Sequence, residues 1–368
     1  MKTTSFRRVI VPGIAALALL VAGCGAGNEE SSGDSSSDSG LSGTLNGGGA
    51  SSQEKAQAAW RAGFQGDNPD ATINYDPVGS GTGRENFING AYSFAGTDSA
   101  INNDEGELDA ATERCGDDVI QVPAYVSPIA VIYNLDGVDQ LNLSAEVIAN
   151  IFNGSITKWN DPAIADLNPD ATLPGDTITP VHRQDDSGTT DNFTQYLAAA
   201  GNGAWKADPD GVWPAEYKGE AAEGTSGVVG AVTDGSGTIG YADASAAADL
   251  GVAAIQVGEE FNTPSAEGAA QVVANSPTVE GASPNDMAVD VDRTTTESGS
   301  YPLLLVSYLL ACPTYDSAEE ADLVKGYLTY VVSDAGQQAA ADEAGSAPLD
   351  SSLSEQAASI IDAISSGS

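Results

Sequence analysis

The sequence is poor in basic residues, histidine and cysteine. Its 368 residues include 13 lysines and arginines against 53 aspartates and glutamates, with one histidine and three cysteines. This balance disfavours DNA, RNA and anionic lipid surfaces as partners, because they need basic patches that neutralise phosphates. The missing histidines also argue against metal-dependent hydrolysis, although Asp117 and Asp118 could hold a hard cation. We expect no nucleic acid partner, no metal and no cofactor.

The N-terminus contains an apolar run, over residues 9–23, that is shorter than a typical transmembrane helix. Basic residues precede it and small residues end it, so residues 1–23 are predicted to be an export signal peptide. The ending "LVAGC" resembles the lipobox of bacterial lipoproteins, which would make Cys24 the lipidated first residue of the exported protein. An ordinary cysteine after a signal peptide is the alternative.

Residues 24–40 are predicted to be a flexible linker, because Ser, Gly, Asp and Glu dominate them and leave little apolar surface to bury. Beyond the linker the only cysteines are Cys115 and Cys312. An even pair in an oxidising compartment favours a disulfide between distant segments, and two buried thiols are the alternative.

Short apolar runs alternate with helical stretches, which is typical of the α/β class. At this length, with 41% hydrophobic residues, the chain is long enough for two lobes. Two long apolar runs, 119–134 and 301–312, are predicted to cross between the lobes. Lobe 1 would then be discontinuous, with residues 41–122 and 296–368, and lobe 2 would hold residues 123–295.

Individual elements are expected from local patterns. Ser144 precedes a run with helical spacing that Gly154 would end, and a last amphipathic helix is expected over residues 352–368. Strands are expected at "ATINYDPVG", "AYSFAGTD", "DTITPVHR", "GTIGYAD" and "VAAIQVG", and a helix at "TTDNFTQYLAAAGNG".

Three segments place glycine and a hydroxyl residue just before a helical stretch: "GGGASSQEKAQAAW" (47–60), "GSGTGRENF" (79–87) and "DSGTTDNF" (186–193). Helix N-termini present free backbone N–H groups and the positive end of a dipole, and glycine allows a ligand to come close. Three converging ends would bind an oxyanion. Taken singly, each is an ordinary helix cap. No nucleotide-binding loop is present.

Arg183 strengthens the oxyanion interpretation, because its planar guanidinium suits bidentate contact with a tetrahedral anion. Asp185 lies two positions further on, hence on the same side of an extended segment, and could hold that guanidinium. An exposed Arg–Asp pair of little energetic value is the alternative.

Several segments together resemble the phosphate-binding protein of the bacterial ABC phosphate uptake transporter, a two-lobed periplasmic-type solute receptor. They occur in that family's order over residues 43–310. The segments are "LNGGGASS", "INYDPVGSGTG", "YSFAGTDSAI", "IFNGSITKWNDPAIADLNP", "VHRQDDSGTT" and "GTIGYAD".

The resemblance implies a phosphate site formed by Ser51, Ser52, Ser80, Asp98, Arg183, Ser187, Gly188 and Thr189, with Asp185 as the partner of the arginine. Ser52 departs from the family, which more often has an aromatic residue there. Asp98 would accept a hydrogen bond from a protonated ligand oxygen and so reject sulfate, which has no proton.

The implied function is that of a receptor and not an enzyme. It would be a monomer, lipid-anchored to the outer face of the cell membrane, that binds inorganic phosphate and passes it to the permease subunits of an ABC transporter. A receptor for sulfate, molybdate or a phosphonate is one alternative. A secreted serine hydrolase or phosphatase is another, with Ser80 or Ser187 as nucleophile and His182 as the only available histidine. In an extended segment His182 and Arg183 point to opposite faces, which disfavours that enzyme.

The four tryptophans raise the alternative of an organic ligand. Trp60, Trp159, Trp205 and Trp213 could stack on an organic ligand, but packing in the core is their expected use.

Overall fold

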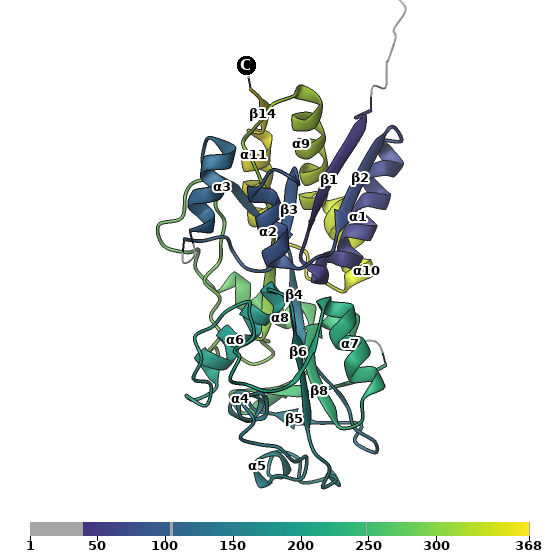
Figure 1. Cartoon of the computed structure of the whole chain (residues 1–368), viewed down its shortest axis with the longest axis vertical. Helices are drawn as coiled ribbons and strands as arrows, with labels where there is room; N and C mark the ends of the chain where they lie inside the picture. The colour runs from purple at the N-terminus through teal and green to yellow at the C-terminus, as the bar shows by residue number, and fades with distance from the viewer. Residues whose placement is uncertain (1–39, 104–105, 248, 368) are drawn as a thin grey trace, which may run out of the picture. The chain divides into compact units, whose positions relative to one another are not determined.

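The long strand β4 (Ile120–Asn134) runs through the middle of the fold (Figure 1). The computed structural model describes residues 40–103, 106–247 and 249–367. The predicted signal peptide, Cys24 and residues 25–39 of the predicted linker lie outside the described residues. All but the last residue of β4 are buried, as expected for an almost continuously apolar strand covered on both faces.

The main sheet has the strand order β2-β1-β3-β12-β4-β8-β6-β7, and β9 pairs with the end of β4 on the edge opposite β8. Parallel pairs join β1 to β2 and to β3, and join β6 to β7 and to β8. The pairs of β12 with β3 and β4, and of β4 with β8, are antiparallel. The strands are β1 (Gly43–Gly49), β2 (Ala71–Asp76), β3 (Phe94–Thr97), β6 (Thr179–Arg183), β7 (Glu220–Ala222), β8 (Thr238–Asp243), β9 (Gly251–Val252) and β12 (Leu304–Ala311).

Strand β4 changes partner along its length. Its first half, up to Pro128, pairs with β12, and the half from Ile129 onward pairs with β8. The same chain segment therefore belongs to the upper and the lower part of the sheet in Figure 1, and the fold is two-lobed. The residue boundaries expected for the lobes remain a prediction. Residues 285–287, within the segment expected for lobe 2, bond to the backbone of Gln121 near the start of β4.

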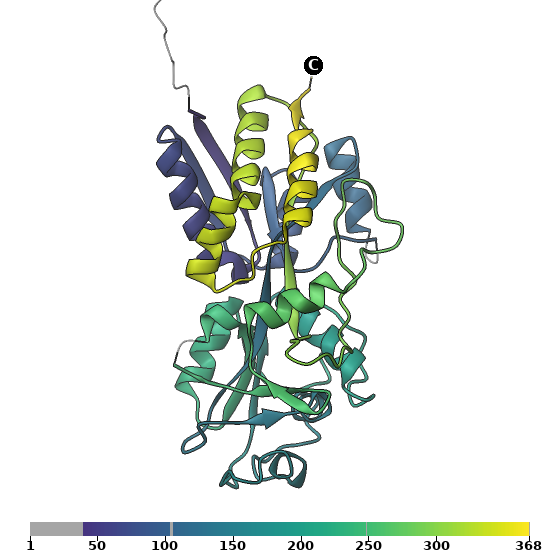
Figure 2. The same ribbon diagram turned by 180° about the vertical axis from the view of Figure 1, so that it is seen from behind.

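Helices cover the sheet in both lobes (Figures 1 and 2). Around β1 to β3 lie the 3-10 helix η1 (Ser51–Gln53) and helices α1 (Glu54–Asp67), α2 (Ser80–Ile88), α3 (Glu107–Cys115), α9 (Ala318–Val332), α10 (Asp334–Ala344) and α11 (Ser351–Asp362). Around β6 and β8 and the lower half of β4 lie α4 (Ala145–Phe152), α5 (Pro162–Ala165), α6 (Gly188–Ala200), α7 (Gly224–Asp234) and η2 (Ala244–Ala246). Helix α8 (Ala266–Ala274) packs against β12 and the first half of β4.

Short strands complete the structure. A second sheet has the order β11-β10-β5, and a third pairs β13 with β14. Their bounds are β5 (Asn142–Leu143), β10 (Ala254–Val257), β11 (Glu260–Asn262), β13 (Thr314–Tyr315) and β14 (Ser365–Ser366).

Most local expectations are confirmed. The Ser144 hydroxyl caps α4 by accepting the Val147 N–H at 3.2 Å, and Gly154 follows the helix with a φ of 81°. The expected last helix is α11, and each expected strand is present. The tryptophans are all buried, so core packing is their use.

Cys115 and Cys312 form a disulfide in the structure, which links the end of α3 to the residue after β12. The bond closes a loop of 197 positions within the part of the fold built on β1 to β3. Closing so long a loop removes much of the conformational freedom of the unfolded chain.

Candidate anion-binding site

Asp98 follows β3 directly and is 3% exposed. Its Oδ1 accepts the Ser307 hydroxyl at 2.6 Å, and its Oδ2 accepts the hydroxyls of Ser52 at 2.6 Å and Thr189 at 3.2 Å. Burial raises the pKa of Asp98, and these hydroxyls together with the charge of Arg183 offset only part of the effect. Asp98 is therefore a buried carboxylate surrounded by neutral donors.

The N-termini of α2 and α6 meet beside Asp98. Ser80, the first residue of α2, accepts the backbone N–H of Asp98 at 3.1 Å. Gly188 begins α6, and a Cβ on it would lie 2.7 Å from the Ser80 Oγ and 2.7 Å from the Cβ of Asp98. Any larger residue would push the two helix ends apart, so glycine is needed here for close approach.

Ser187 is the N-cap residue of α6, and its Oγ accepts the Thr190 N–H at 3.2 Å. This is the ordinary role that helix caps have. A hydroxyl that accepts through a lone pair still carries a proton to donate. Within the described residues, the hydroxyl protons of Ser187 and Ser80 have no acceptor, so both can serve a ligand.

Arg183 ends β6 and forms a bidentate pair with Asp185. Its Nε donates to Asp185 Oδ1 at 2.8 Å and its Nη2 to Oδ2. Asp185 Oδ1 also accepts the Gly224 N–H at 3.0 Å, at the start of α7. Burial alone would raise the pKa of Asp185, but the hydrogen bonds and charge of Arg183 and the Gly224 N–H outweigh it and lower that pKa. The guanidinium is 3% exposed and fixed in orientation.

Ser51 meets the N-terminus of α7. Its Oγ accepts the Thr225 N–H at 3.1 Å and lies 3.0 Å from the Thr225 hydroxyl. Glycine and a hydroxyl residue, Gly224 and Thr225, stand here before a helix, in the same pattern as in the three segments recognised in the sequence. The repeated pattern could have identified this fourth helix end.

Asn192 bridges the two lobes at the same place. Its Nδ2 donates to the carbonyl of Asp98 at 2.8 Å and to that of Gly188 at 2.8 Å. Its Oδ1 accepts from Arg293, whose Nη1 donates to the Leu304 carbonyl of β12 at 2.8 Å. Asn192 therefore ties the α6 N-terminus to Asp98, and buried Arg293 ties Asn192 to the central strands.

Hydrogen bonds and close contacts connect Ser52, Ser80, Asp98, Gly188 and Thr189. Together with Ser51, Arg183 and Ser187 they form the candidate set of eight residues that is called the anion site below. Ser307, Asn192 and Thr225 also contact it and were not anticipated from the sequence. Ser307 is a polar residue in the otherwise apolar run 301–312, and that interruption was a usable signal. Asn192 had none, because its role depends on a tertiary contact.

His182 packs against Trp213 and not against a candidate nucleophile in the contacts of the described residues. Its ring stacks on Trp213 at 4.7 Å, and its Nδ1 lies 2.9 Å from the Arg183 carbonyl oxygen. Burial lowers the pKa of His182. In the described part of the chain, neither Ser80 nor Ser187 hydrogen-bonds to this histidine. The pair of groups that a serine hydrolase requires is not assembled here.

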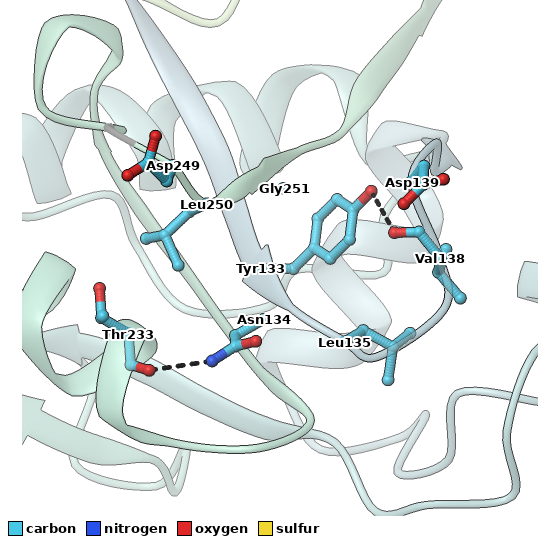
Figure 3. Close-up of a pocket in the computed structure, with 9 residues that line it drawn as sticks. All are labelled: Tyr133, Asn134, Leu135, Val138, Asp139, Thr233, Asp249, Leu250 and Gly251. Carbon is cyan, nitrogen blue, oxygen red and sulfur yellow. Dashed lines mark hydrogen bonds between the residues drawn. The ribbon is translucent and has the colours of Figure 1, made fainter.

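One other concave region is poorly suited to an anion. A pocket of about 520 Å³ at the far end of β4 is lined by nine residues that include no lysine or arginine (Figure 3). Asp139 and Asp249 face it, which would repel an anion. Among the described residues, no group of three or more His, Cys, Asp or Glu could hold a metal ion. None of their helices has the length and apolar character to cross a bilayer.

The chain is similar in sequence to a known family and to characterised members of it. The model of the PBP superfamily domain matches residues 34–335. The phosphate-binding protein PstS 3 of Mycobacterium tuberculosis is 36% identical over 369 residues, which cover 95% of this chain and 96% of that protein. The phosphate-binding protein PstS 2 of the same species is 33% identical and covers 96% and 97%.

The fold resembles that of solved structures. One is a high-affinity periplasmic phosphate-binding protein, PfluDING, bound with phosphate, with a TM-score of 0.70 and 23% identity over 85% of this chain and 92% of that one. Another is a phosphate-binding protein from Stenotrophomonas maltophilia, with a TM-score of 0.65 and 20% identity, covering 86% and 94%. At these identities the likeness establishes the fold.

Proposed function

Because the chain belongs to the PBP superfamily and, within it, to the PstS phosphate-binding proteins, we propose that it is an extracytoplasmic receptor for inorganic phosphate. It binds phosphate between its two lobes and delivers it to the permease subunits of an ABC transporter. Binding and release require no covalent step, so the protein is a receptor and not an enzyme.

One observation carries this proposal. A fixed cation, Arg183, and a carboxylate that has no ion pair among the described residues, Asp98, lie together at converging helix ends. Arg183 supplies the positive charge for the anion, held by Asp185. Ser80 and Ser187 supply hydroxyl protons, and the N-termini of α2 and α6 supply backbone N–H groups. This set complements a small tetrahedral oxyanion.

Asp98 selects among such anions. An ionised carboxylate can only accept hydrogen bonds, so a ligand oxygen can lie against it only when that oxygen carries a proton. Phosphate retains at least one proton near neutral pH, whereas sulfate has none and would meet like charge in a desolvated place. This argument favours phosphate over sulfate and molybdate.

Ligand binding also has to rearrange the hydroxyls around Asp98. Ser52 and Thr189 both donate to its Oδ2 in the structure, where a ligand proton would have to be accepted. We expect the two hydroxyls to turn toward ligand oxygens when phosphate binds. Asp98 then accepts one hydrogen bond from a ligand O–H in place of the two hydrogen bonds from Ser52 and Thr189.

Contacts between the lobes support closure around the ligand. Thr189 and Asn192 reach from α6 to Asp98, and Ser51 reaches the N-terminus of α7. These bonds connect the same elements that surround the anion site. Opening would break them together, which gives a route for release to a permease.

The proposal includes membrane attachment through Cys24. A lipid anchor contributes roughly 0.8 kcal/mol per buried CH₂, so two or more acyl chains would hold a monomer at the outer face of the membrane. Replacing Cys24 with Ala should release the protein into the medium or block its maturation. Unchanged membrane fractionation together with an unchanged N-terminal mass would exclude the anchor.

Calorimetry on the exported protein, after removal of carried-over ligand by unfolding and refolding, tests the function. Phosphate should bind tightly, and sulfate, molybdate and a phosphonate should bind at least about a thousandfold more weakly. Preferential binding of one of the other anions would contradict the assignment of the ligand. A second check is a phosphate assay on purified protein after denaturation, since tight receptors keep their ligand through purification.

A further inference from the structure

Arg84 is a buried arginine outside the set of residues assigned to the anion site. It lies on α2, about one turn beyond Ser80, and its side chain is 10% exposed. Its Nε donates to Glu107 Oε2 at 2.7 Å, its Nη1 to the Thr97 hydroxyl at 3.3 Å and its Nη2 to Asp186 Oδ2 at 3.4 Å. The guanidinium therefore contacts two carboxylates and a hydroxyl.

The two carboxylates belong to different lobes. Glu107 is the first residue of α3, which lies with α2 and the strands β1 to β3 in the upper part of Figure 1. Asp186 lies between β6 and α6, which belong to the lower part. Within the described ranges of the chain, no other ion pair joins the lobes. Arg84 therefore has one charged partner in its own lobe and one in the other lobe.

The backbone of Asp186 lies close to the start of α2. Its carbonyl accepts the Gly81 N–H at 3.2 Å, and a Cβ on Gly81 would overlap the Asp186 carboxylate. Gly81 follows Ser80 and Asp186 precedes Ser187, so the Arg84–Asp186 pair lies next to the two helix ends of the anion site. Separation of these helix ends has to break the pair.

A cavity of about 300 Å³ adjoins the ion pair. Its lining includes Arg84 and Glu107 from one lobe and Asp186 and Asp191 from the other. The Asp186 side chain is 36% exposed, so water reaches it, whereas Arg84 is shielded. When the lobes separate, Asp186 is hydrated and Arg84 keeps Glu107, so neither charge is left buried without a partner. The pair can therefore be broken at low cost, which suits a receptor that has to release its ligand.

We propose that the Arg84–Asp186 ion pair is a latch between the lobes, which forms when they close around phosphate and determines how slowly the ligand leaves. The inference rests on the proposed function and adds to it a positioning pair that touches no ligand atom. The charge-assisted bond is made only in the closed form, so it stabilises that form relative to the open one. Phosphate held between closed lobes then stays bound for longer without any new contact to it.

The test is the dissociation rate of radiolabelled inorganic phosphate, measured by rapid filtration after dilution into excess unlabelled phosphate, for wild type and Asp186→Asn. The variant should release phosphate about tenfold faster, with an association rate close to that of wild type. Loss of a negative charge beside a bound anion would by itself strengthen binding, so faster release cannot come from charge alone. The phosphate-to-sulfate ratio should stay the same, because Asp98 is intact. Unchanged or slower release of phosphate would overturn the proposal.

A matched control is Glu107→Gln. This variant also removes a carboxylate partner of Arg84, but the pair lies within one lobe and is present whether the lobes are open or closed. We expect a lower melting temperature and a dissociation rate like that of wild type. Release as fast as in Asp186→Asn would show that loss of any partner of Arg84 is sufficient, and the latch would be excluded.

Arg84→Met tests the latch from its other side. It should speed the release of phosphate, and adding Asp186→Asn to it should cause no further increase, because the same pair is already lost. Additive increases would mean that the two residues act separately, which contradicts the proposal. Absence of phosphate binding by wild type would instead refute the proposed function itself, which keeps the two failures distinct.

Discussion

Two aspartates at the anion site, partly buried Asp185 and buried Asp98, have pKa values that are shifted in opposite directions. Asp185 beside Arg183 has a lowered pKa, because the arginine and a backbone N–H outweigh its burial. Asp98 at the end of β3 has a raised pKa, because burial outweighs its three hydroxyl donors. The paired carboxylate orients a cation, and the carboxylate with neutral donors remains sensitive to the proton of a ligand.

The largest expected effect comes from Asp98→Asn. Wild type should favour phosphate over sulfate by about 10⁴ to 10⁵. Removing one of the opposing charges should lower that ratio by roughly a thousandfold, since like charges in contact cost several kcal/mol. Competition binding with the two anions measures the ratio. An unchanged phosphate-to-sulfate ratio would mean that Asp98 only accepts hydrogen bonds from the neighbouring hydroxyls and does not select the ligand.

Arg183→Ala should weaken phosphate binding by roughly a hundredfold or more, because it removes the charge-assisted contacts and leaves the partly buried Asp185 without its cation. Asp185→Asn is the matched comparison and should cost only about tenfold, through looser positioning of the guanidinium. Calorimetry distinguishes the two. Wild-type affinity in Arg183→Ala would contradict the assignment of the cation.

Asp243 gives a pH test that needs no ligand. Burial and, to a lesser extent, the charge of Asp98 raise its pKa from 3.8 to about 6 in the folded protein. The folded state therefore favours the protonated form, and stability that is present below the unfolded pKa is lost as pH rises through about 6. The loss amounts to about 3 kcal/mol at most. The free energy of unfolding by urea should show it in wild type and not in Asp243→Asn.

Asp185 should show the reverse dependence. Because its folded pKa is lowered, its contribution to stability is present above the unfolded pKa and is lost as pH falls through the folded value. Asp185→Asn should therefore reduce the acid sensitivity of unfolding. If both variants shifted the stability profile in the same direction, the contrast between the paired and the unpaired carboxylates would be wrong.

The smallest expected effect is that of Asn192→Ala. The amide ties the Asp98 carbonyl to the α6 N-terminus and has no assigned ligand contact. Its loss should weaken phosphate binding by about tenfold, through poorer alignment, and leave the phosphate-to-sulfate ratio unchanged. A change in that ratio would place Asn192 among the groups that discriminate between ligands.

Local sequence patterns predicted much of the fold and part of the site. The cap at Ser144, the apolar runs of β4 and β12 and the start of α6 after Ser187 each follow from neighbouring residues. The start of α7 at Gly224 carried the same glycine–hydroxyl signal and was overlooked. Ser307 was visible only as one polar residue in an apolar run.

The sequence by itself determined the α/β alternation, the helix N-termini and the Arg183–Asp185 pair, because periodicity, caps and two-residue spacing act over a few neighbouring positions. Tertiary structure decided which side chains share the site. Asp98 meets Ser307 across 209 positions and Asn192 across 94, and Asp243 lies opposite Ile129 only through the register of β4 and β8. Such partners depend on strand pairing and on how much water the packing excludes, and neither is encoded within a short segment.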